Sequence, residues 1–306
     1  MLNKSKVLAL VSFSLLLITC NQNDKDKQDK ETILKGSVTV LTDETLTPVV
    51  DDQMLIFQDI YGAKVTVVSK SEAEIVNDLL NQKFAVAFMA RNLSDKEKMV
   101  FEQKKIVPRV TPFATDAIAL IGNKSNNDTL IALQDVISFM EGKSAKGIKG
   151  LVFDNPNSST VRYLKDLAKV AAIPTEGVYS FKTNEEVIKF VAENEGMIGV
   201  VGVNWLTQPL PEMNEFINKV NILSVRGLND EKYYAPTQNS LAKGFYPLAR
   251  ELYIVNCQGS AGLGMGISSF VAGDIGQRII LKSELLPYKT PGRKIIIRNE
   301  IINDKK

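Results

Sequence analysis

Hydrophobic residues occur along most of the chain in short continuous runs that alternate with stretches of helical spacing. Short apolar runs bounded by turn residues favour buried strands, whereas apolar residues three and four positions apart favour amphipathic helices. The predicted strands are residues 37–41, 63–68, 84–89, 117–121, 149–153, 176–179 and 196–202. The predicted helices are residues 48–60, 72–80, 95–103, 130–140, 161–171 and 185–193. Strands that alternate with helices predict an α/β fold.

The pattern changes after residue 225, where turn-forming residues become frequent. The later predicted elements are a strand at 251–256, helices at 267–271 and 276–281, and a weak closing strand at 294–303. The strand–helix pattern repeats loosely before and after Asp116, without a fixed period. We therefore expect two α/β lobes, each a mixed sheet flanked by helices, joined by crossing strands. Lobe 1 would comprise residues 33–115 and 231–306, and lobe 2 residues 116–230.

Residues 153–164 combine the end of a strand, a turn and the start of a helix, and the turn contains Ser158, Ser159 and Thr160 in succession. The first-turn N–H groups of a helix have no intrahelical acceptor, and the helix dipole favours negative charge there. This stretch therefore predicts an anion-binding site. A simpler interpretation is that Ser158 or Ser159 only caps the helix, as serine commonly does.

Polar loops follow two other predicted strands at the edge of the sheet where ligands bind in open α/β folds. The loop after the first strand contains Asp43, Glu44 and Thr45, and Arg91 follows the apolar strand 84–89. Arginine can clamp an oxyanion with two parallel hydrogen bonds, although Arg91 could equally be a solvated loop residue.

Composition narrows the chemistry that the chain can perform. The 306 residues carry a formal net charge of +2 and include no histidine, so neither a nucleic-acid partner nor imidazole catalysis is expected. Two cysteines, Cys20 and Cys257, cannot build a tetrahedral zinc site, and no cofactor is expected. Cys257 ends an apolar run and is predicted to be a buried free thiol.

The N-terminus has the features of a secretory signal. Lys4 and Lys6 precede an apolar run at 7–18 that is too short to span a membrane, and the run ends near Cys20. This ending resembles a bacterial lipobox, so residues 1–19 would be a lipoprotein signal peptide and Cys20 its lipidation site. A plain signal peptide is the alternative. Residues 20–32 are polar and are predicted to form a flexible tether to the membrane.

Several strings resemble the phosphate-binding proteins of bacterial ABC transporters, in matching order over most of the mature chain. They are FATDAIAL at 113–120 with NK at 123–124, NPNSST at 155–160, GMIGVVG at 196–202 and FYPLARELY at 245–253. The resemblance implies a two-lobed Venus-flytrap fold of type II that clamps phosphate between its lobes. It also implies ABC transporter permease subunits as partners, a monomer, and a place in the cell envelope facing the periplasm or the exterior.

The chain departs from the family pattern at charged positions. Ser159 stands where the family loop has glycine, Asp154 where the family often has arginine, and Ala90-Arg91 where many members have Ser-Asp. The resemblance therefore suggests that an arginine and a carboxylate are exchanged across the cleft.

The resulting hypothesis is binding without catalysis. Ser158, Ser159 and Thr160 would donate hydrogen bonds to a tetrahedral oxyanion, and Arg91 would supply positive charge. Carboxylates could accept the proton of hydrogen phosphate or could merely cap helices. The further candidate ligand residues are Glu44, Thr45, Thr115 and Asp116, followed by Asp43, Asp154, Asn155 and Arg162.

Three alternatives remain open at this stage. The protein could bind another oxyanion, or it could be a sensor or surface lipoprotein with the same fold. A serine hydrolase is the third alternative, although residues 153–164 lack a Gly-x-Ser-x-Gly elbow. The glycine-rich residues 262–266 do not follow a dinucleotide-binding pattern and are predicted to form a tight turn into a helix.

Overall fold

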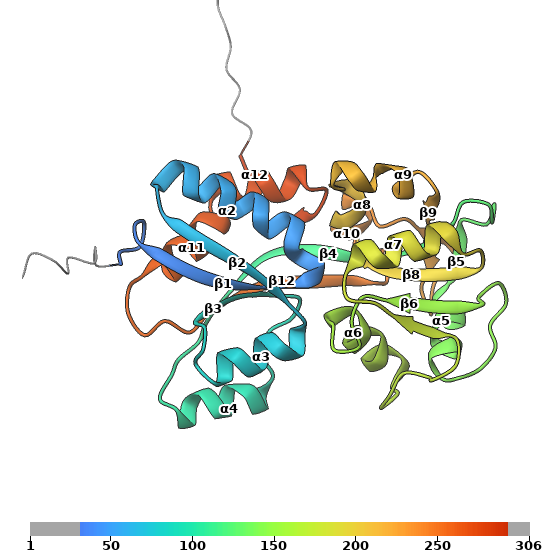
Figure 1. Cartoon of the computed structure of the whole chain (residues 1–306), viewed down its shortest axis with the longest axis horizontal. Coiled ribbons are helices and arrows are strands. Elements are labelled where there is room, and N and C mark those ends of the chain that lie inside the picture. Colours follow the sequence, from blue (N-terminus) through green and yellow to red (C-terminus); the bar gives the residue numbers. More distant parts are fainter. Residues whose placement is uncertain (1–30, 293–306) are drawn as a thin grey trace, which may run out of the picture.

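A computed structural model describes residues 31–292 and shows two α/β lobes side by side (Figure 1). The predicted two-lobed fold is confirmed, and each lobe has a sheet with helices on both faces. The predicted signal peptide, Cys20 and the closing strand 294–303 lie outside the described residues, as does most of the tether. Within residues 31–292, no helix is both long enough and apolar enough to cross a membrane.

The first lobe is built on three parallel strands and one antiparallel strand, in the order β2-β1-β3-β12. Helices α2, α11 and α12 cover one face, and α3 and α4 cover the other (Figure 1). The fully buried β3 contributes four apolar residues to the core. The strands are β1 (Ser37–Asp43), β2 (Lys64–Lys70), β3 (Val86–Met89) and β12 (Ala249–Asn256). The helices are α2 (Thr47–Tyr61), α3 (Glu72–Leu80), α4 (Asp95–Gln103), α11 (Leu263–Val271) and α12 (Asp274–Lys282).

The second lobe continues the same sheet through β8, β6 and β7. A separate small sheet joins β5 (Leu130–Ala132), β10 (Ser224–Arg226) and β11 (Tyr233–Tyr234). The remaining strands are β6 (Gly150–Phe153), β7 (Val178–Ser180), β8 (Met197–Gly202) and β9 (Val220–Ile222). The helices are α5 (Leu133–Met140), α6 (Ser159–Ala168), α7 (Asn184–Glu193), α8 (Asn204–Thr207) and α9 (Asn214–Ile217). Helix α10 (Gln238–Ala242) lies against the end of α12, because Gln238 donates to the carbonyls of Leu281 and Leu285.

Strand β4 (Arg109–Asn123) connects the two lobes. Its first part pairs with β12 up to Ala117, and its second part pairs with β8 from Ile118 onward. The change of partner occurs next to Asp116, where the sequence pattern places the boundary between lobes. The lobe boundaries themselves remain a prediction. The short strand β13 (Leu286–Pro287) pairs with β4 beside Thr115.

Local signals predict several elements correctly and others with errors. Helices α3 and α4 have the predicted bounds, and both begin with a serine–glutamate capping box. The helix predicted at 130–140 begins only at Leu133, because residues 130–132 pair with β10 instead. The helix predicted at 185–193 begins one residue earlier, at Asn184, and its cap is Thr183.

The glycines at 262–266 are partly helical rather than a turn, because α11 begins at Leu263. At Gly266, an added Cβ would lie 1.6 Å from the Ile33 carbonyl oxygen, so only glycine lets the N-terminal segment pack there. Cys257 is a partly buried free thiol, and burial raises its pKa to about 11.

Candidate functional site

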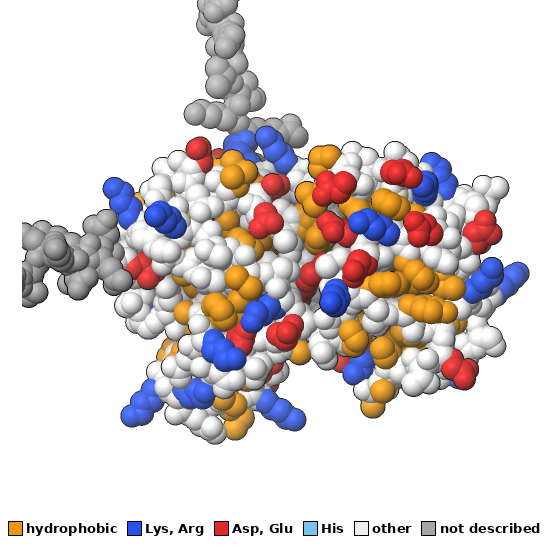
Figure 2. Space-filling view, in the orientation of Figure 1, with side chains coloured by type: hydrophobic (Ala, Val, Ile, Leu, Met, Phe, Trp, Pro, Cys, Tyr) orange, Lys and Arg blue, Asp and Glu red, His pale blue; other side chains and the backbone are white. Residues whose placement is uncertain are grey.

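The cleft between the lobes lies at the carboxyl ends of the parallel strands β1, β2 and β3. The N-terminus of α6 faces this edge from the second lobe, and Figure 2 shows a hollow between the lower halves of the lobes. This hollow has a volume of about 400 Å³. The side chains that line it belong mainly to α3, the loop after β3, and α6, and they include Glu72, Arg91, Glu97, Ser158 and Arg162.

All three hydroxyl residues at the start of α6 are buried. Ser158 caps the helix, since its Oγ accepts a hydrogen bond of 3.3 Å from the backbone N–H of Val161. Its Oγ also lies 2.8 Å from Thr160 Oγ1, and the Thr160 hydroxyl donates to Asp154 Oδ1 at 2.8 Å. Ser158 therefore acts as the N-cap of α6. A carboxylate of the chain itself lies at the helix end where an anion was expected.

The guanidinium of Arg250 is buried where the two lobes meet. It donates two hydrogen bonds to Asp116, of 3.0 Å from Nε and 2.6 Å from Nη2. It also donates to Ser159 Oγ at 2.8 Å and to Thr45 Oγ1 at 3.4 Å, so it contacts both lobes. Burial lowers the pKa of Arg250, but the Asp116 carboxylate outweighs this effect and the net shift is upward.

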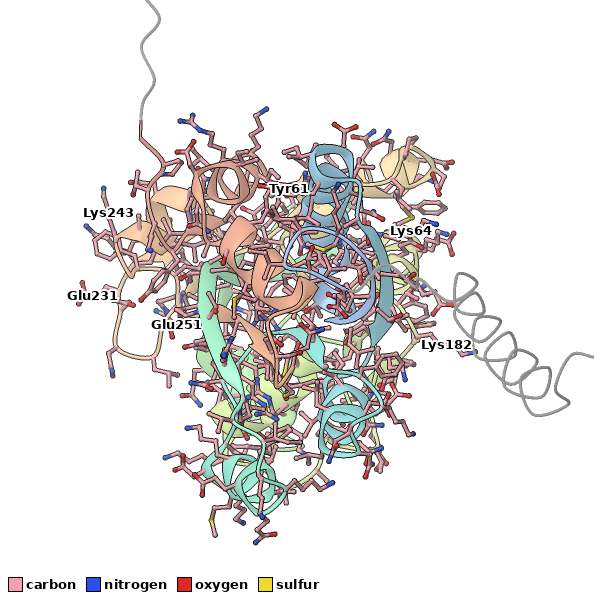
Figure 3. All side chains as sticks on the ribbon, turned by 90° about the vertical axis from the view of Figure 1, so that its left-hand side faces the viewer. Tyr61, Lys64, Lys182, Glu231, Lys243 and Glu251 are labelled. Carbon is pink, nitrogen blue, oxygen red and sulfur yellow. The ribbon has the colours of Figure 1, made fainter. Side chains whose placement is uncertain are left out.

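Sequence reasoning did not select Arg250 as a site residue, although it lies in the string FYPLARELY. Strand β12 places Arg250 directly opposite Asp116 in the β4–β12 register, and both side chains are buried. The next residue, Glu251, points to the opposite face and reaches the molecular surface (Figure 3). The sequence does contain a signal for Arg250: an arginine stands at an inward position of a mostly apolar strand. A buried charge of this kind needs a buried partner.

Asp43 lies beside this arginine, at the end of β1. Its Oδ1 accepts hydrogen bonds from the backbone N–H and the hydroxyl of Thr45, at 3.0 and 2.8 Å. Burial raises the pKa of Asp43 to about 6, Arg250 opposes the rise, and the nearby Glu72 carboxylate adds to it. Asp43 therefore changes its charge within the range of mildly acidic solutions.

Glu44 reaches across the cleft to the N-terminus of α7. Its Oε1 accepts from the backbone N–H of Asn184 at 2.9 Å, and its Oε2 accepts from the Asn184 side-chain amide. The same amide donates to Asp154 Oδ2 at 3.5 Å, and Asn184 Oδ1 accepts from the Gly202 N–H at 3.1 Å. Burial, with Asp154 nearby, raises the pKa of Glu44 to about 9. Asn184 is thus a second site residue that sequence reasoning missed.

Arg91 and Arg162 both contact the Glu72 carboxylate at the mouth of the cleft. Arg91 Nε lies 2.8 Å and Arg162 Nε 2.6 Å from Glu72 Oε1. Arg91 also forms two hydrogen bonds of 2.8 Å with Glu97, so its guanidinium is engaged by carboxylates of its own lobe. The suggested exchange of charges across the cleft stays a hypothesis, since Arg91 and Asp154 have different partners. Arg162, a further candidate ligand residue, bridges to the other lobe.

Two candidates lie apart from these contacts. Thr115 is partly buried and, next to Asp116 in β4, points to the other face of the sheet, where β13 pairs with it. Asn155 organises the turn before α6, because its Oδ1 accepts from the Asn157 N–H at 2.9 Å. Neither side chain contributes to the cluster around Arg250.

Polar groups of both lobes surround the Ser159 hydroxyl. It accepts a hydrogen bond from Arg250, and the Thr45 hydroxyl lies 3.4 Å away. The Asp43 carboxylate is also near this hydroxyl, because hydrogen bonding by Ser159 lowers the pKa of Asp43. Among residues 31–292, no group of three or more potential metal ligands occurs.

A model of the PBP superfamily domain matches residues 27–274, which is most of the chain. The chain belongs to the PBP superfamily. A search of curated proteins found no match. Solved structures of this superfamily fold resemble the chain despite low sequence identity.

A structure from Clostridium perfringens, described as a phosphate ABC transporter substrate-binding protein with bound phosphate, has a TM-score of 0.68 and 17% identity. The match covers 83% of this chain and 100% of that one. An ABC-type phosphate transport receptor from Vibrio cholerae has a TM-score of 0.61 and 15% identity over 82% of this chain and 100% of its own. The regulatory domain of an OxyR2 variant from Vibrio vulnificus has a TM-score of 0.51 and 10% identity. This match covers 78% of this chain and 98% of that one.

Proposed function

We propose that this PBP superfamily member is an extracytoplasmic solute-binding protein that captures inorganic phosphate, or a related oxyanion, between its lobes. The observation that carries the proposal is the contact of Arg250 with Ser159 across the cleft, at the N-terminus of α6. An arginine and a helix N-terminus are two features that favour an oxyanion at one place. The phosphate described in the Clostridium perfringens neighbour supports phosphate as the first candidate.

The proposed ligand replaces contacts that the chain now makes with itself. Ser159 Oγ would turn from Arg250 to the oxyanion, and Arg250 would keep its paired hydrogen bonds to Asp116 while Nη1 reaches the ligand. Thr45 and Thr160 provide further hydroxyls from the two lobes. At neutral pH, Asp43 and Asp154 would disfavour an oxyanion that carries no proton, because like charges repel.

Delivery of the solute to ABC transporter permease subunits is part of the proposal, and so is anchoring to the membrane through a lipid on Cys20. A lipoprotein of this kind would face the periplasm or the exterior and act as a monomer. The named transport receptors among the structural neighbours support the transport role. A sensor is the second candidate, because a regulatory domain shares the fold.

Calorimetric titration and thermal shift with phosphate, sulfate, molybdate and simple phosphonates test the proposal. A ligand whose free concentration is about a hundred times its dissociation constant adds roughly 2.7 kcal/mol to the free energy of unfolding. We expect phosphate to raise the melting temperature and sulfate to have a much smaller effect. Failure of every oxyanion to bind would overturn the proposed function. Hydrolysis of ester substrates by the same preparation would favour the hydrolase instead.

A further inference from the structure

Two buried carboxylate oxygens in the cleft accept no hydrogen bond from any described residue. They are Oδ2 of Asp43 and Oε2 of Glu72. Both residues are almost completely buried, with exposed fractions of 1% and 3%. A buried carboxylate oxygen without a donor is costly, so such atoms usually mark a place where a ligand donates.

The two carboxylates come from neighbouring positions of the fold. Asp43 ends β1 and pairs in register with Lys70, the last residue of β2, and Glu72 begins α3 two residues later. They are close enough for the Glu72 charge to act on Asp43. Lys70 does not serve as their donor, since its Nζ pairs with Asp78 and lies 5.4 Å from the centre of the Phe84 ring.

Each carboxylate is held in place through its other oxygen. Oδ1 of Asp43 is fixed by Thr45, and Oε1 of Glu72 is fixed by Arg91 and Arg162. The two unpaired oxygens therefore cannot rotate toward other donors without breaking short hydrogen bonds. We call these two oxygens of the first lobe the acceptor pair, and Glu72 lies near the start of α6, since Arg162 of that helix contacts it.

The balance of charge around the acceptor pair is negative. Asp116 and Arg250 neutralise each other, and Glu72 and Glu97 are matched by Arg91 and Arg162. Asp43 and Asp154 remain without a cation of their own, whereas Glu44, with its pKa of about 9, keeps its proton at neutral pH and adds no charge. A fully anionic ligand would add to this repulsion, whereas an ammonium would relieve it.

We propose that the cleft binds a zwitterion that carries a primary ammonium together with a phosphonate or phosphate-ester group. The ammonium donates to Asp43 Oδ2 and Glu72 Oε2, and the oxyanion lies between Arg250 and the N-terminus of α6. This rests on the proposed oxyanion site and narrows its substrate class. Hydrogen phosphate supplies one proton for donation, whereas an ammonium supplies three.

Calorimetry with a matched set of ligands tests this inference on the full chain. The probes are 2-aminoethylphosphonate, ethylphosphonate, which lacks the amine, and inorganic phosphate. We expect 2-aminoethylphosphonate to bind at least about tenfold more tightly than ethylphosphonate. This ratio corresponds to the free energy of a hydrogen bond to a charged partner. Asp43→Asn should reduce this ratio to about threefold or less, because the asparagine keeps an acceptor for Thr45 and loses the charge. Glu72→Gln should act in the same direction.

Asp95→Asn is the control, because it removes a negative charge from an exposed side chain on α4, outside the cleft. It should leave the ratio unchanged. Equal binding of the two phosphonates, or a ratio unaffected by both Asp43→Asn and Glu72→Gln, would overturn the inference. Phosphate binding would then still support the proposed function. Absence of binding by all three probes would overturn both.

Discussion

Arg250 is buried at a position where its charge is matched by Asp116 on the neighbouring strand. The pair supports two further polar contacts, to Ser159 and Thr45, so one side chain connects β12, β4 and both walls of the cleft. At the scale of single residues, the site depends on this pair. A charge this deep is tolerated only while its partner and hydrogen bonds remain.

Replacing Arg250 with methionine should destabilise the fold strongly, because the Asp116 carboxylate is left buried without its partner. The expected loss is about 3 to 5 kcal/mol, measured by urea unfolding. The double variant Arg250→Met with Asp116→Leu should recover most of this loss, since both charges are gone. A double variant as unstable as the single one would show that the ion pair is not the cause.

The elevated pKa of Asp43 predicts a specific dependence of stability on pH. Below the ordinary pKa of 3.8, Asp43 is protonated in both states. Between pH 3.8 and about 6, Asp43 ionises in the unfolded state but keeps its proton in the folded state, because burial and Glu72 outweigh Arg250. An acid whose pKa is raised by folding therefore loses stability over this window. The shift from 3.8 to about 6 corresponds to roughly 3 kcal/mol.

The variant Asp43→Asn does not titrate and provides the reference. Its unfolding free energy relative to the wild type should increase by roughly 3 kcal/mol between pH 4 and pH 7. Urea unfolding of both proteins at several pH values measures this difference. A difference that stays constant with pH would contradict the assigned pKa.

At the scale of elements, the N-terminus of α6 combines a structural cap with the proposed binding surface. Ser158 caps α6 in the cleft, and Ser94 caps α4 in the same way on the outside of the first lobe. Both serines accept from a backbone N–H three residues later, at 3.3 Å. The two helices therefore offer a matched comparison between a cap alone and a cap at the cleft.

Ser158→Ala and Ser94→Ala should each cost about 1 kcal/mol of stability, because each removes an N-cap. Only Ser158→Ala should also weaken phosphate binding, by roughly tenfold, since the helix end at the cleft loses a hydroxyl donor. Thermal unfolding and calorimetric titration separate the two effects. Equal phosphate affinities in both variants would argue that α6 does not bind the anion.

At the scale of the whole molecule, the lobes contact each other through the chain's own polar groups. Arg162 pairs with Glu72, Glu44 binds Asn184, and Arg250 reaches Ser159. Periplasmic-type binding proteins close by a hinge motion around a ligand. Here these interactions, together with the hydrogen bond from Ala73 N–H to the Asn157 carbonyl, already join the two walls.

Arg162→Gln should weaken closure, because it removes an ion pair between lobes. Small-angle X-ray scattering should show a larger radius of gyration without ligand and contraction when a binding oxyanion is added. Arg278→Gln is the control, since Arg278 pairs with Asp274 within α12. Identical scattering from the wild type and Arg162→Gln would show that this ion pair does not control the opening.

The sequence by itself determined the features that depend on near neighbours. Capping boxes set the starts of α3 and α4, and the hydroxyl residues before α6 indicated its N-terminus. Alternating strands and helices indicated two lobes, and Asp116 was placed near their junction. The helix starts and the two-lobed fold are confirmed, because hydrogen bonds and apolar spacing within a few residues decide them, and the lobe boundaries stay a prediction.

Only the tertiary structure decided which polar groups meet in the cleft. Arg250 lies 134 residues from Asp116, and Glu44 lies 140 residues from Asn184. Arg91 was a reasonable anion clamp from its position after a strand, yet the fold places Glu72 and Glu97 against it. The partner of a buried charge depends on strand register and lobe packing, and neither leaves a signal in adjacent residues.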